Sequence, residues 1–255
     1  MGVIDRFWLG GKVAVVTGGS RGLGAAFARA LAEAGADVAI TARDPERSRH
    51  AVAELRDLGV RAMATDTDVT DSAQVTAMVA RVTDELGPID VLVNNAGISE
   101  GGAALDVTDE AWRKVLDVNL DGVWRCSRQV GAQMVARRTG SIVNVGSMSG
   151  MIVNRPRWQP AYLAAKAAVH QLTKALAAEW APYGVRVNAL APGYFLTEQS
   201  PVDQPEYQPW CVDPAPMRRY GLPHELGPAA VFLASDASSF MTGSVVVIDG
   251  GYTLF

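Results

Sequence analysis

The sequence predicts a single α/β domain whose parallel sheet of seven strands is covered by helices on both faces. Two observations predict this fold class. Short runs rich in β-branched residues alternate with longer, Ala-rich segments of helical period. Most of the short runs are apolar on both faces, which is typical of parallel strands buried between two helical layers. No repeat, linker or low-complexity stretch divides residues 1–255, so we expect one domain.

The expected elements follow one another in strict alternation for most of the chain. The strands are expected at Val13–Thr17, Val38–Thr41, Arg61–Thr65, Ile89–Val93, Ser141–Val145, Val185–Leu190 and Ser244–Ile248. The helices are expected at Gly24–Ala34, Pro45–Leu58, Ser72–Leu86, Asp109–Ala136, Ala161–Tyr183 and His224–Leu233. Residues 198–222 break the alternation, because their five prolines cannot sit in a long helix. We expect this segment to be a loop that covers the substrate.

Composition excludes several classes of protein. The net charge is −4 without a basic cluster, which argues against a nucleic-acid partner. No apolar run reaches the length of about 18 residues that a membrane span needs. The two cysteines, Cys126 and Cys211, form no CxxC motif, and the three histidines have no metal-binding spacing. We therefore expect a soluble cytoplasmic protein that binds no metal.

A glycine-rich turn follows the first expected strand. It reads Thr17-Gly-Gly-Ser-Arg-Gly-Leu-Gly24 and runs directly into the first helix. Glycines at Gly18 and Gly22 permit a tight turn and a close approach of the backbone to a ligand. The helix N-terminus then offers free N–H groups and a positive dipole end to a pyrophosphate. The turn is therefore a candidate dinucleotide-binding site.

Four motifs make the chain resemble the short-chain dehydrogenase/reductase family. They are the glycine-rich turn, Asn94-Asn95-Ala96-Gly97 after the fourth strand, Tyr162-x-x-x-Lys166, and Pro192-Gly193 after the sixth strand. The resemblance runs from Gly11 to Thr253 and implies a Rossmann-type fold and a nicotinamide cofactor. It implies a cofactor site made by Gly18, Ser20, Arg21, Gly22, Leu23, Gly24, Arg43, Asp68, Val69, Asn95, Ala96, Gly97, Tyr162, Lys166, Pro192, Gly193 and Thr197.

The end of the second strand favours NADP(H) over NAD(H). An acid at this place binds the 2′-hydroxyl of NAD, whereas an Arg accommodates the 2′-phosphate of NADP. Ala42 occupies the position of the family's NAD-selecting Asp, and Arg43 follows it. Arg21 in the glycine turn adds a second guanidinium, and two guanidiniums suit a dianionic phosphate. Asp44 comes next and is able to hold a ribose hydroxyl, so NAD(H) stays an alternative.

Tyr162 and Lys166 are the candidate proton-transfer pair. Four residues apart on a helix, they share a face, and a nearby ammonium favours the phenolate and lowers the pKa of Tyr162. A tyrosine with a lowered pKa is a usable general acid or base. The resemblance implies that Lys166 also holds the nicotinamide ribose. It implies that Asn119 completes the catalytic set, its amide supporting a water that links Lys166 to solvent.

A hydroxyl donor that polarises the substrate carbonyl is also expected after the fifth strand. Ser149 lies thirteen residues before Tyr162, which is the family's usual distance, whereas Ser147 lies fifteen before it. The local pattern Asn144-Val-Gly-Ser147-x-x-Gly150 matches the family at Ser147. We therefore predict Ser147 as the catalytic serine, with Ser149 as the alternative.

The segment Gly146–Pro156 resembles the polyol-dehydrogenase branch of the family, as do residues 168–174 and 250–253. That branch includes mannitol, sorbitol, arabinitol and galactitol dehydrogenases and relatives acting on gluconate. We expect the substrate to contact Ser147, Ser149, Asn154 and Tyr162. The predicted reaction moves a hydride between NADP(H) and a secondary alcohol/ketone pair, in a polyol or sugar derivative.

Two other functions are open to a chain of this kind. One is reduction of a 3-oxoacyl thioester on a carrier protein, for which the charge of −4 gives no support. The other is a non-catalytic, regulatory dinucleotide-binding protein, which would not need Asn119, Ser147, Tyr162 and Lys166 together. The resemblance also implies a homotetramer, with a dimer as the alternative.

Overall fold

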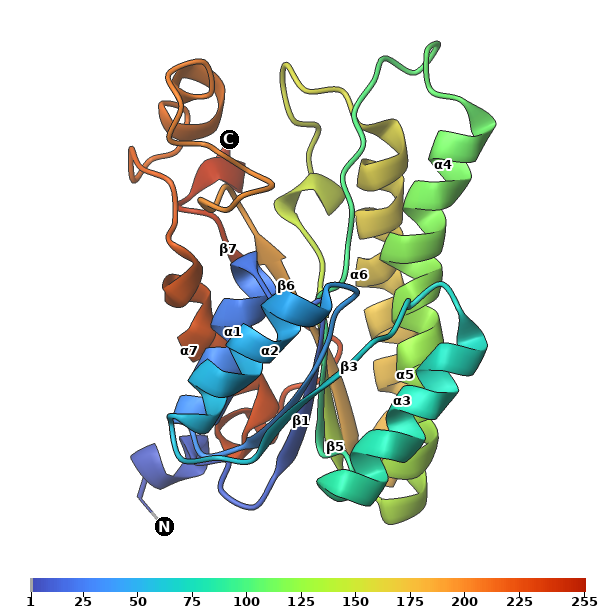
Figure 1. Ribbon diagram of the computed structural model, residues 1–255. Helices are drawn as coiled ribbons and strands as arrows, with labels where there is room; N and C mark the ends of the chain where they lie inside the picture. Colours follow the sequence, from blue (N-terminus) through green and yellow to red (C-terminus); the bar gives the residue numbers. More distant parts are fainter. Residues whose placement is uncertain (1) are drawn as a thin grey trace.

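The computed structural model describes residues 2–255 and has one seven-stranded sheet at its centre (Figure 1). The strand order is β3-β2-β1-β4-β5-β6-β7, and every neighbouring pair is parallel. The predicted fold class is therefore confirmed. The strands are β1 Val13–Thr17, β2 Asp37–Thr41, β3 Ala62–Thr65, β4 Val91–Asn94, β5 Gly140–Val145, β6 Val185–Pro192 and β7 Val245–Ile248.

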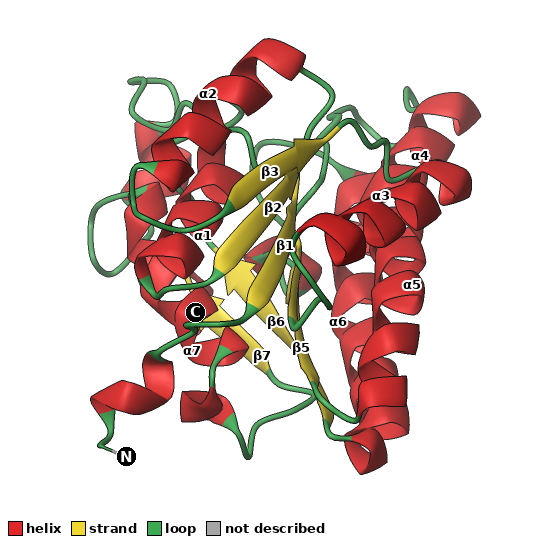
Figure 2. Ribbon diagram, turned by 60° about the horizontal axis from the view of Figure 1, so that its bottom comes forward, coloured by secondary structure: helices red, strands yellow, loops and turns green. Residues whose placement is uncertain are grey.

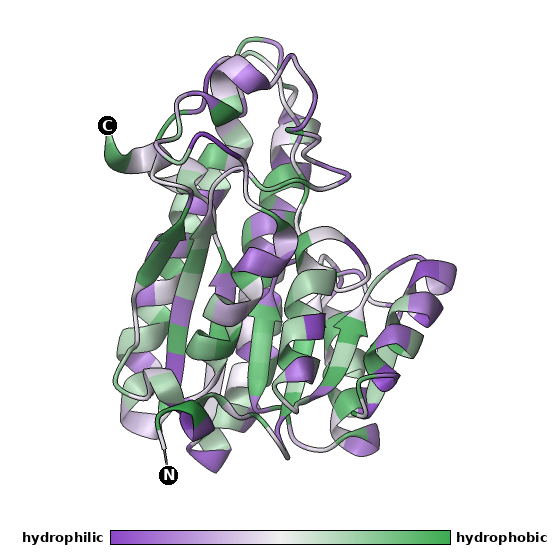
Figure 3. Ribbon diagram, turned by 90° about the vertical axis from the view of Figure 1, so that its left-hand side faces the viewer, coloured by the Kyte–Doolittle hydropathy of each residue, from purple (hydrophilic) through white to green (hydrophobic). Residues whose placement is uncertain are grey.

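Helices cover both faces of the sheet, and each face has its own apolar layer (Figure 2). The layer under α1, α2 and α7 includes Phe27 and Leu31, and the layer under α3, α5 and α6 includes Met78 and Trp180. Figure 3 shows the hydrophobic strands beneath helices of mixed polarity. The helices are α1 Gly22–Glu33, α2 Pro45–Arg56, α3 Ser72–Glu85, α4 Asp109–Leu116, α5 Gly122–Arg137, α6 Pro160–Trp180 and α7 Gly227–Ala234.

The helix predicted over residues 109–136 is interrupted, which the sequence analysis did not anticipate. A π-helical turn at Asp117–Asp121 separates α4 from α5. The Asn119 side chain within this turn donates to the carbonyls of Ile98 and Val115, both at 2.9 Å, and accepts from the Ile98 N–H at 3.3 Å. These bonds tie the widened turn to the chain that leaves β4. Such π-turns are frequent at functional sites.

The segment 198–222 is irregular, as predicted. Apart from a π-helical turn at Gln208–Val212, its described residues form turns and isolated bridges. A small apolar cluster of Val202, Cys211 and Val212 anchors it, with Tyr194 and Tyr207 packed against them. The segment therefore has a core of its own beside the main sheet.

The strand order reverses between β1 and β4, which are neighbours in the sheet although β2 and β3 lie between them in sequence. In open parallel sheets, ligands bind in the crevice at the carboxyl ends of the strands where the order reverses. No helix in the part of the chain that the structure describes is long and apolar enough to cross a membrane.

Candidate active site

A cavity of about 1180 Å³ lies along the carboxyl ends of β1 to β6. Typical pockets for small ligands measure roughly 300–1,000 Å³, so this one has room for a dinucleotide and a second small molecule. All the residues predicted for the site line it. They are Gly18, Ser20, Arg21, Gly22, Leu23, Gly24, Arg43, Asp68, Val69, Asn95, Ala96, Gly97, Asn119, Ser147, Ser149, Asn154, Tyr162, Lys166, Pro192, Gly193 and Thr197.

The glycine-rich turn is held tightly against the end of β4. Gly18 has a φ of +65°, in the left-handed region that favours glycine. A Cβ on Gly24 would lie 2.1 Å from the Gly18 carbonyl oxygen, so the first turn of α1 packs on the loop only without a side chain there. The Asn95 amide donates to the carbonyls of Thr17 and Gly18 at 2.9 and 3.2 Å. The turn is therefore held by the end of β4 and by its own close packing.

The N-terminus of α1 lacks a side-chain cap. Its N-cap residue, Arg21, is extended and makes no capping hydrogen bond, whereas Asp44 and Asp71 cap α2 and α3. The first N–H groups of a helix need partners, and their partial positive charge favours an anion. This uncapped terminus beside the glycine cradle fits the pyrophosphate of a dinucleotide.

Arg43 and Asp68 lie together beyond the ends of β2 and β3. The Arg43 guanidinium is 3.5 Å from the Asp68 carboxylate, and its side chain is 72% exposed. Hydrogen bonds from Thr70 are the main cause that holds the pKa of Asp68 below its ordinary value, and the charge of Arg43 adds to them. The nearby Asp44 carboxylate caps α2 by accepting from the backbone of Glu46 and Arg47 at 3.0 and 3.1 Å. Asp44 is therefore engaged in the structure of α2.

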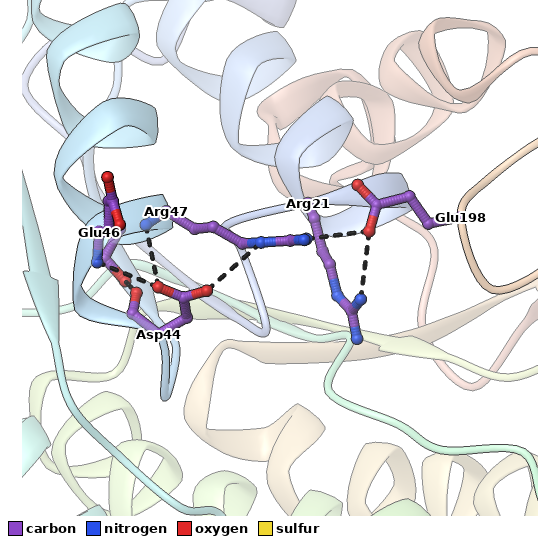
Figure 4. Close-up of polar contacts among 6 residues, drawn as sticks. Arg21, Asp44, Glu46, Arg47 and Glu198 are labelled. Atoms are coloured by element: carbon purple, nitrogen blue, oxygen red, sulfur yellow. Dashed lines mark hydrogen bonds and ion pairs between the residues drawn. The ribbon is translucent and has the colours of Figure 1, made fainter.

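A third guanidinium, which the sequence analysis missed, belongs to Arg47 in the first turn of α2 (Figure 4). It donates to the Glu198 carboxylate at 2.9 Å, and Arg21 contacts the same oxygen at 3.3 Å. Asp44 and Pro45 mark the start of α2, so the sequence already placed Arg47 in the first turn of this helix, close to the end of β2. Nothing in the sequence pattern paired it with Glu198, 151 residues away.

Lys166 and Tyr162 share one face of α6, as predicted. The Lys166 ammonium lies 5.6 Å from the centre of the Tyr162 ring and donates to the Val145 carbonyl at 2.7 Å. The lysine is 4% exposed, and burial lowers its pKa to about 8. Among the described residues, Val145 is the partner to which this buried ammonium donates.

The pKa of Tyr162 lies above its ordinary value, so the expected lowering is wrong for this structure. Burial is the main cause, because it disfavours the charged phenolate. A hydrogen bond from Ser147 and the positive charge of Arg157 act in the opposite direction and are outweighed. The prediction counted a nearby cation and left out the desolvation of the phenol.

Ser147 is the serine that reaches Tyr162. It follows β5 in an extended conformation, and its hydroxyl oxygen accepts from the Ser149 backbone N–H at 3.1 Å. This bond fixes the oxygen beside Tyr162, and a serine hydroxyl that accepts in this way keeps its one hydrogen for a bond to Tyr162 or to a substrate oxygen. Ser149 lines the same cavity, and its backbone N–H holds the Ser147 hydroxyl in position.

His170 packs behind the turn that carries Ser147. The imidazole is 8% exposed and fills the space left by two glycines, since a Cβ on Gly146 would lie 2.3 Å from its Nε2 and one on Gly150 would lie 2.9 Å from its Cε1. Burial, and then the charges of Lys166 and Lys174, lower its pKa. A neutral imidazole therefore supports the serine turn from behind.

Polar groups also converge on the far side of the cavity. Asn154 is buried, and its amide donates to the Tyr194 hydroxyl at 3.0 Å. The Asn154 carbonyl oxygen Oδ1 is buried without a partner among residues 2–255. Tyr194 was not predicted; it follows the Pro192-Gly193 motif directly, and that adjacency was the signal for it. No group of three or more His, Cys, Asp or Glu side chains able to hold a metal occurs among the described residues.

Known proteins match this chain over nearly its whole length. A family model described as "Enoyl-(Acyl carrier protein) reductase" matches residues 18–253. Galactitol 2-dehydrogenase (L-tagatose-forming) from Cereibacter sphaeroides is 47% identical over 252 residues, 98% of each chain. The crystal structure of a short-chain type dehydrogenase/reductase from Mycobacterium marinum superposes with a TM-score of 0.95 at 42% identity, covering 99% of each chain.

A further solved structure is a gluconate 5-dehydrogenase from Burkholderia cenocepacia in complex with NADP and tartrate. It has a TM-score of 0.94 and 39% identity, and the match covers 100% of each chain. The family model covers Gly18–Gly24 of the glycine-rich turn and the Tyr162–Lys166 pair. The chain therefore belongs to the short-chain dehydrogenase/reductase family and is an NAD(P)-dependent oxidoreductase acting on CH–OH groups.

Proposed function

We propose that the chain interconverts a secondary alcohol and a ketone in a polyol or sugar derivative, with NADP(H) as its cofactor. One observation carries the proposal: the Ser147–Tyr162–Lys166 group shares a cavity with the unpartnered, buried oxygen of Asn154. A buried polar atom without a partner costs about 1–3 kcal/mol, and a substrate hydroxyl would supply the missing donor. The galactitol dehydrogenase relative supports the same substrate class.

Each catalytic side chain has a definite task in this proposal. When bound, the nicotinamide supplies the hydride chemistry. In the oxidation, Tyr162 takes the proton from the substrate hydroxyl as the hydride leaves the carbon, and Ser147 donates a hydrogen bond to the same oxygen. Lys166 would stabilise the phenolate and hold the nicotinamide ribose. In the reduction, Tyr162 returns the proton to the alkoxide oxygen.

The phosphate-binding side supports NADP(H). Ala42 leaves no carboxylate at the end of β2 for a ribose 2′-hydroxyl, and Asp44 is engaged in capping α2. Arg21, Arg43 and Arg47 line the cavity nearby, and guanidiniums suit a phosphate dianion. The gluconate 5-dehydrogenase relative was solved with NADP. Asp68 and Val69 would contact the adenine.

Several finer assignments belong to the same proposal. The segment 198–222 would cover the substrate, because Tyr207 and Trp210 line the cavity from it. Ser149 and Asn154 would bind substrate hydroxyls. The homotetramer, the cytoplasmic location and the single-domain organisation stay predictions.

A spectrophotometric screen tests the substrate class. Galactitol, sorbitol, mannitol, gluconate and the matching ketoses are offered with both cofactors, beside an acetoacetyl thioester. We expect turnover of polyols or sugar acids with NADP(H) and little with the thioester. Preferential reduction of the thioester, or a higher kcat/KM with NAD(H), would contradict the proposal.

Tyr162→Phe tests the mechanism. Loss of the proton-transfer group should reduce kcat by about 10²- to 10⁴-fold while NADP still binds. Cofactor affinity is measured by calorimetry, so that binding and turnover are read separately. Tyr183→Phe is the control, since this half-exposed tyrosine lies outside the cavity lining. Full activity of Tyr162→Phe would remove the tyrosine from the mechanism.

A further inference from the structure

We propose that Glu198 discriminates between the two cofactors: its carboxylate occupies Arg21 and Arg47, and the 2′-phosphate of NADP must displace it to bind them. This inference rests on the proposed use of NADP(H). It places a determinant of cofactor choice on the segment 198–222, far in sequence from the end of β2.

The geometry brings three separate parts of the chain to one point. Arg21 is the N-cap of α1, Arg47 lies in the first turn of α2, and Glu198 approaches both from the other side of the crevice (Figure 4). The Glu198 oxygen Oε2 lies 3.3 Å from Arg21 and 2.9 Å from Arg47. A single carboxylate oxygen therefore bridges two guanidiniums.

The backbone beside Glu198 lies next to the glycine turn and forms a tight turn of its own. The methyl carbon of Thr197 would lie 3.6 Å from a Cβ placed on Gly22. Thr197 and Ser200 exchange backbone hydrogen bonds of 3.1 and 3.0 Å, which close a tight turn around Glu198. The carboxylate is therefore presented to the arginines by a local structure.

The charges of this cluster balance, which matters for an incoming anion. Three guanidiniums, those of Arg21, Arg43 and Arg47, face three carboxylates, those of Asp44, Asp68 and Glu198. The formal sum is 3 − 3 = 0. A 2′-phosphate consequently meets a neutral cluster, and one carboxylate has to withdraw before the full positive charge is available.

Glu198 is the carboxylate best able to withdraw. Asp44 accepts from two backbone N–H groups of α2, and Asp68 accepts from the backbone and side chain of Thr70. The hydrogen bonds of Glu198 go to Arg21 and Arg47. Withdrawal of Glu198 therefore leaves intact both the cap of α2, which Asp44 makes, and the loop that Asp68 holds through Thr70.

The expected effect is moderate because the pair is exposed. The side chains of Arg21, Arg47 and Glu198 are 47%, 48% and 60% exposed. Exposed ion pairs are weak and salt-sensitive, whereas guanidinium–phosphate pairs are shorter and stronger. Glu198→Gln should tighten NADP binding by about threefold to fivefold and leave NAD binding nearly unchanged.

Calorimetry on the full chain tests the proposal without relying on turnover. The ligands are adenosine 2′,5′-bisphosphate and NADP⁺, with 5′-AMP and NAD⁺ as the partners that lack the 2′-phosphate. We expect Glu198→Gln to tighten the binding of adenosine 2′,5′-bisphosphate and NADP⁺ only. Arg47→Gln should weaken the binding of these same two ligands only. In the Arg47→Gln background, Glu198→Gln should tighten the binding of these two ligands by less than it does in the wild type. Glu206→Gln is the matched control, an exposed acid of the same segment that lines the cavity without an ion pair among the described residues.

The outcomes separate this proposal from the choice of NADP(H) itself. If the wild type favours ligands with a 2′-phosphate and Glu198→Gln behaves like Glu206→Gln, the role of Glu198 is overturned while NADP(H) stands. If the wild type shows no such preference but Glu198→Gln creates one, the role of Glu198 is supported and NADP(H) fails as the preferred cofactor. An equal change for NADP⁺ and NAD⁺ in Glu198→Gln also overturns the proposal.

Discussion

Lys166 shows how a catalytic residue differs from one selected for stability. The ammonium is buried and donates to the Val145 carbonyl, and burial brings its pKa down from 10.5 to about 8. A buried charge with so few partners destabilises the folded state. The residue is therefore expected to lower stability in return for positive charge beside Tyr162.

Replacing Lys166 with Met should stabilise the chain and abolish turnover. The folded pKa of about 8 lies below the ordinary 10.5, so between these values the unfolded chain binds more protons. The loss of folding free energy caused by burying the ammonium is complete below pH 8, and it disappears as the pH rises through 10.5. Near pH 7 the variant should gain on the order of 1–3 kcal/mol in free energy of unfolding.

Denaturant titrations at several pH values measure this effect. The difference between wild type and Lys166→Met should shrink as the pH rises from 8 to 10.5. Lys114→Met is the control, since this exposed lysine pairs with Glu100 at the surface. A difference that stays constant with pH would mean that burial of the charge is not what destabilises the fold.

At the scale of elements, the π-turn between α4 and α5 connects packing to the site. The hydrogen bonds of Asn119 link Ile98, after β4, to Val115 in α4, and the turn packs against α6, which carries Tyr162 and Lys166. Both amide hydrogens of Asn119 are used in these bonds. Its side chain is thus placed to position the helices, and support of a water beside Lys166 stays a prediction.

Asn119→Ala should therefore reduce both stability and turnover. The carbonyls of Ile98 and Val115 would lose their buried donor, which costs about 1–3 kcal/mol. Thermal unfolding and kcat are the measurements. Asn188→Ala is the matched control, because this buried Asn bonds Met241 and Ser244 and does not line the cavity. The control should lose similar stability and keep its kcat; equal losses of kcat in both would contradict a role for Asn119 at the site.

The elements themselves were predictable because burial and period leave clear marks in the sequence. Short β-branched runs, most of them apolar on both faces, identified every strand to within a few residues, and the glycine turn marked the start of α1. The π-turn was not predictable, since one extra residue in a helical turn does not disturb the apolar period enough to be seen. Arg47 and Glu198 were missed for another reason: their contact depends on how α2 and a distant loop meet in space.

The whole molecule exposes large apolar side chains at its C-terminal end. Leu254 and Phe255 are 71% and 102% exposed, and Figure 3 shows this hydrophobic tip projecting from the body of the molecule. Strand β7 forms the edge of the sheet and is only partly buried. Exposed apolar groups of this kind mark interaction surfaces.

Light scattering after size-exclusion chromatography should give the mass of four chains of 27.0 kDa each. Phe255→Ser should shift the equilibrium towards dimers, because it removes an apolar contact from the expected interface. Leu105→Ser is the control, an equally exposed apolar residue on the loop before α4. A monomeric wild type would refute the predicted tetramer.

The short stretch from Tyr194 to Glu198 has a practical consequence for redesign. Tyr194 bonds Asn154 at one end of the cavity, and four residues later Glu198 bonds Arg47 at the other. A loop grafted here to accept a new alcohol would bring its own preference for the coenzyme with it. Mutant libraries that randomise the whole stretch need selection on both ligands at once, because residues at both of its ends line the cavity.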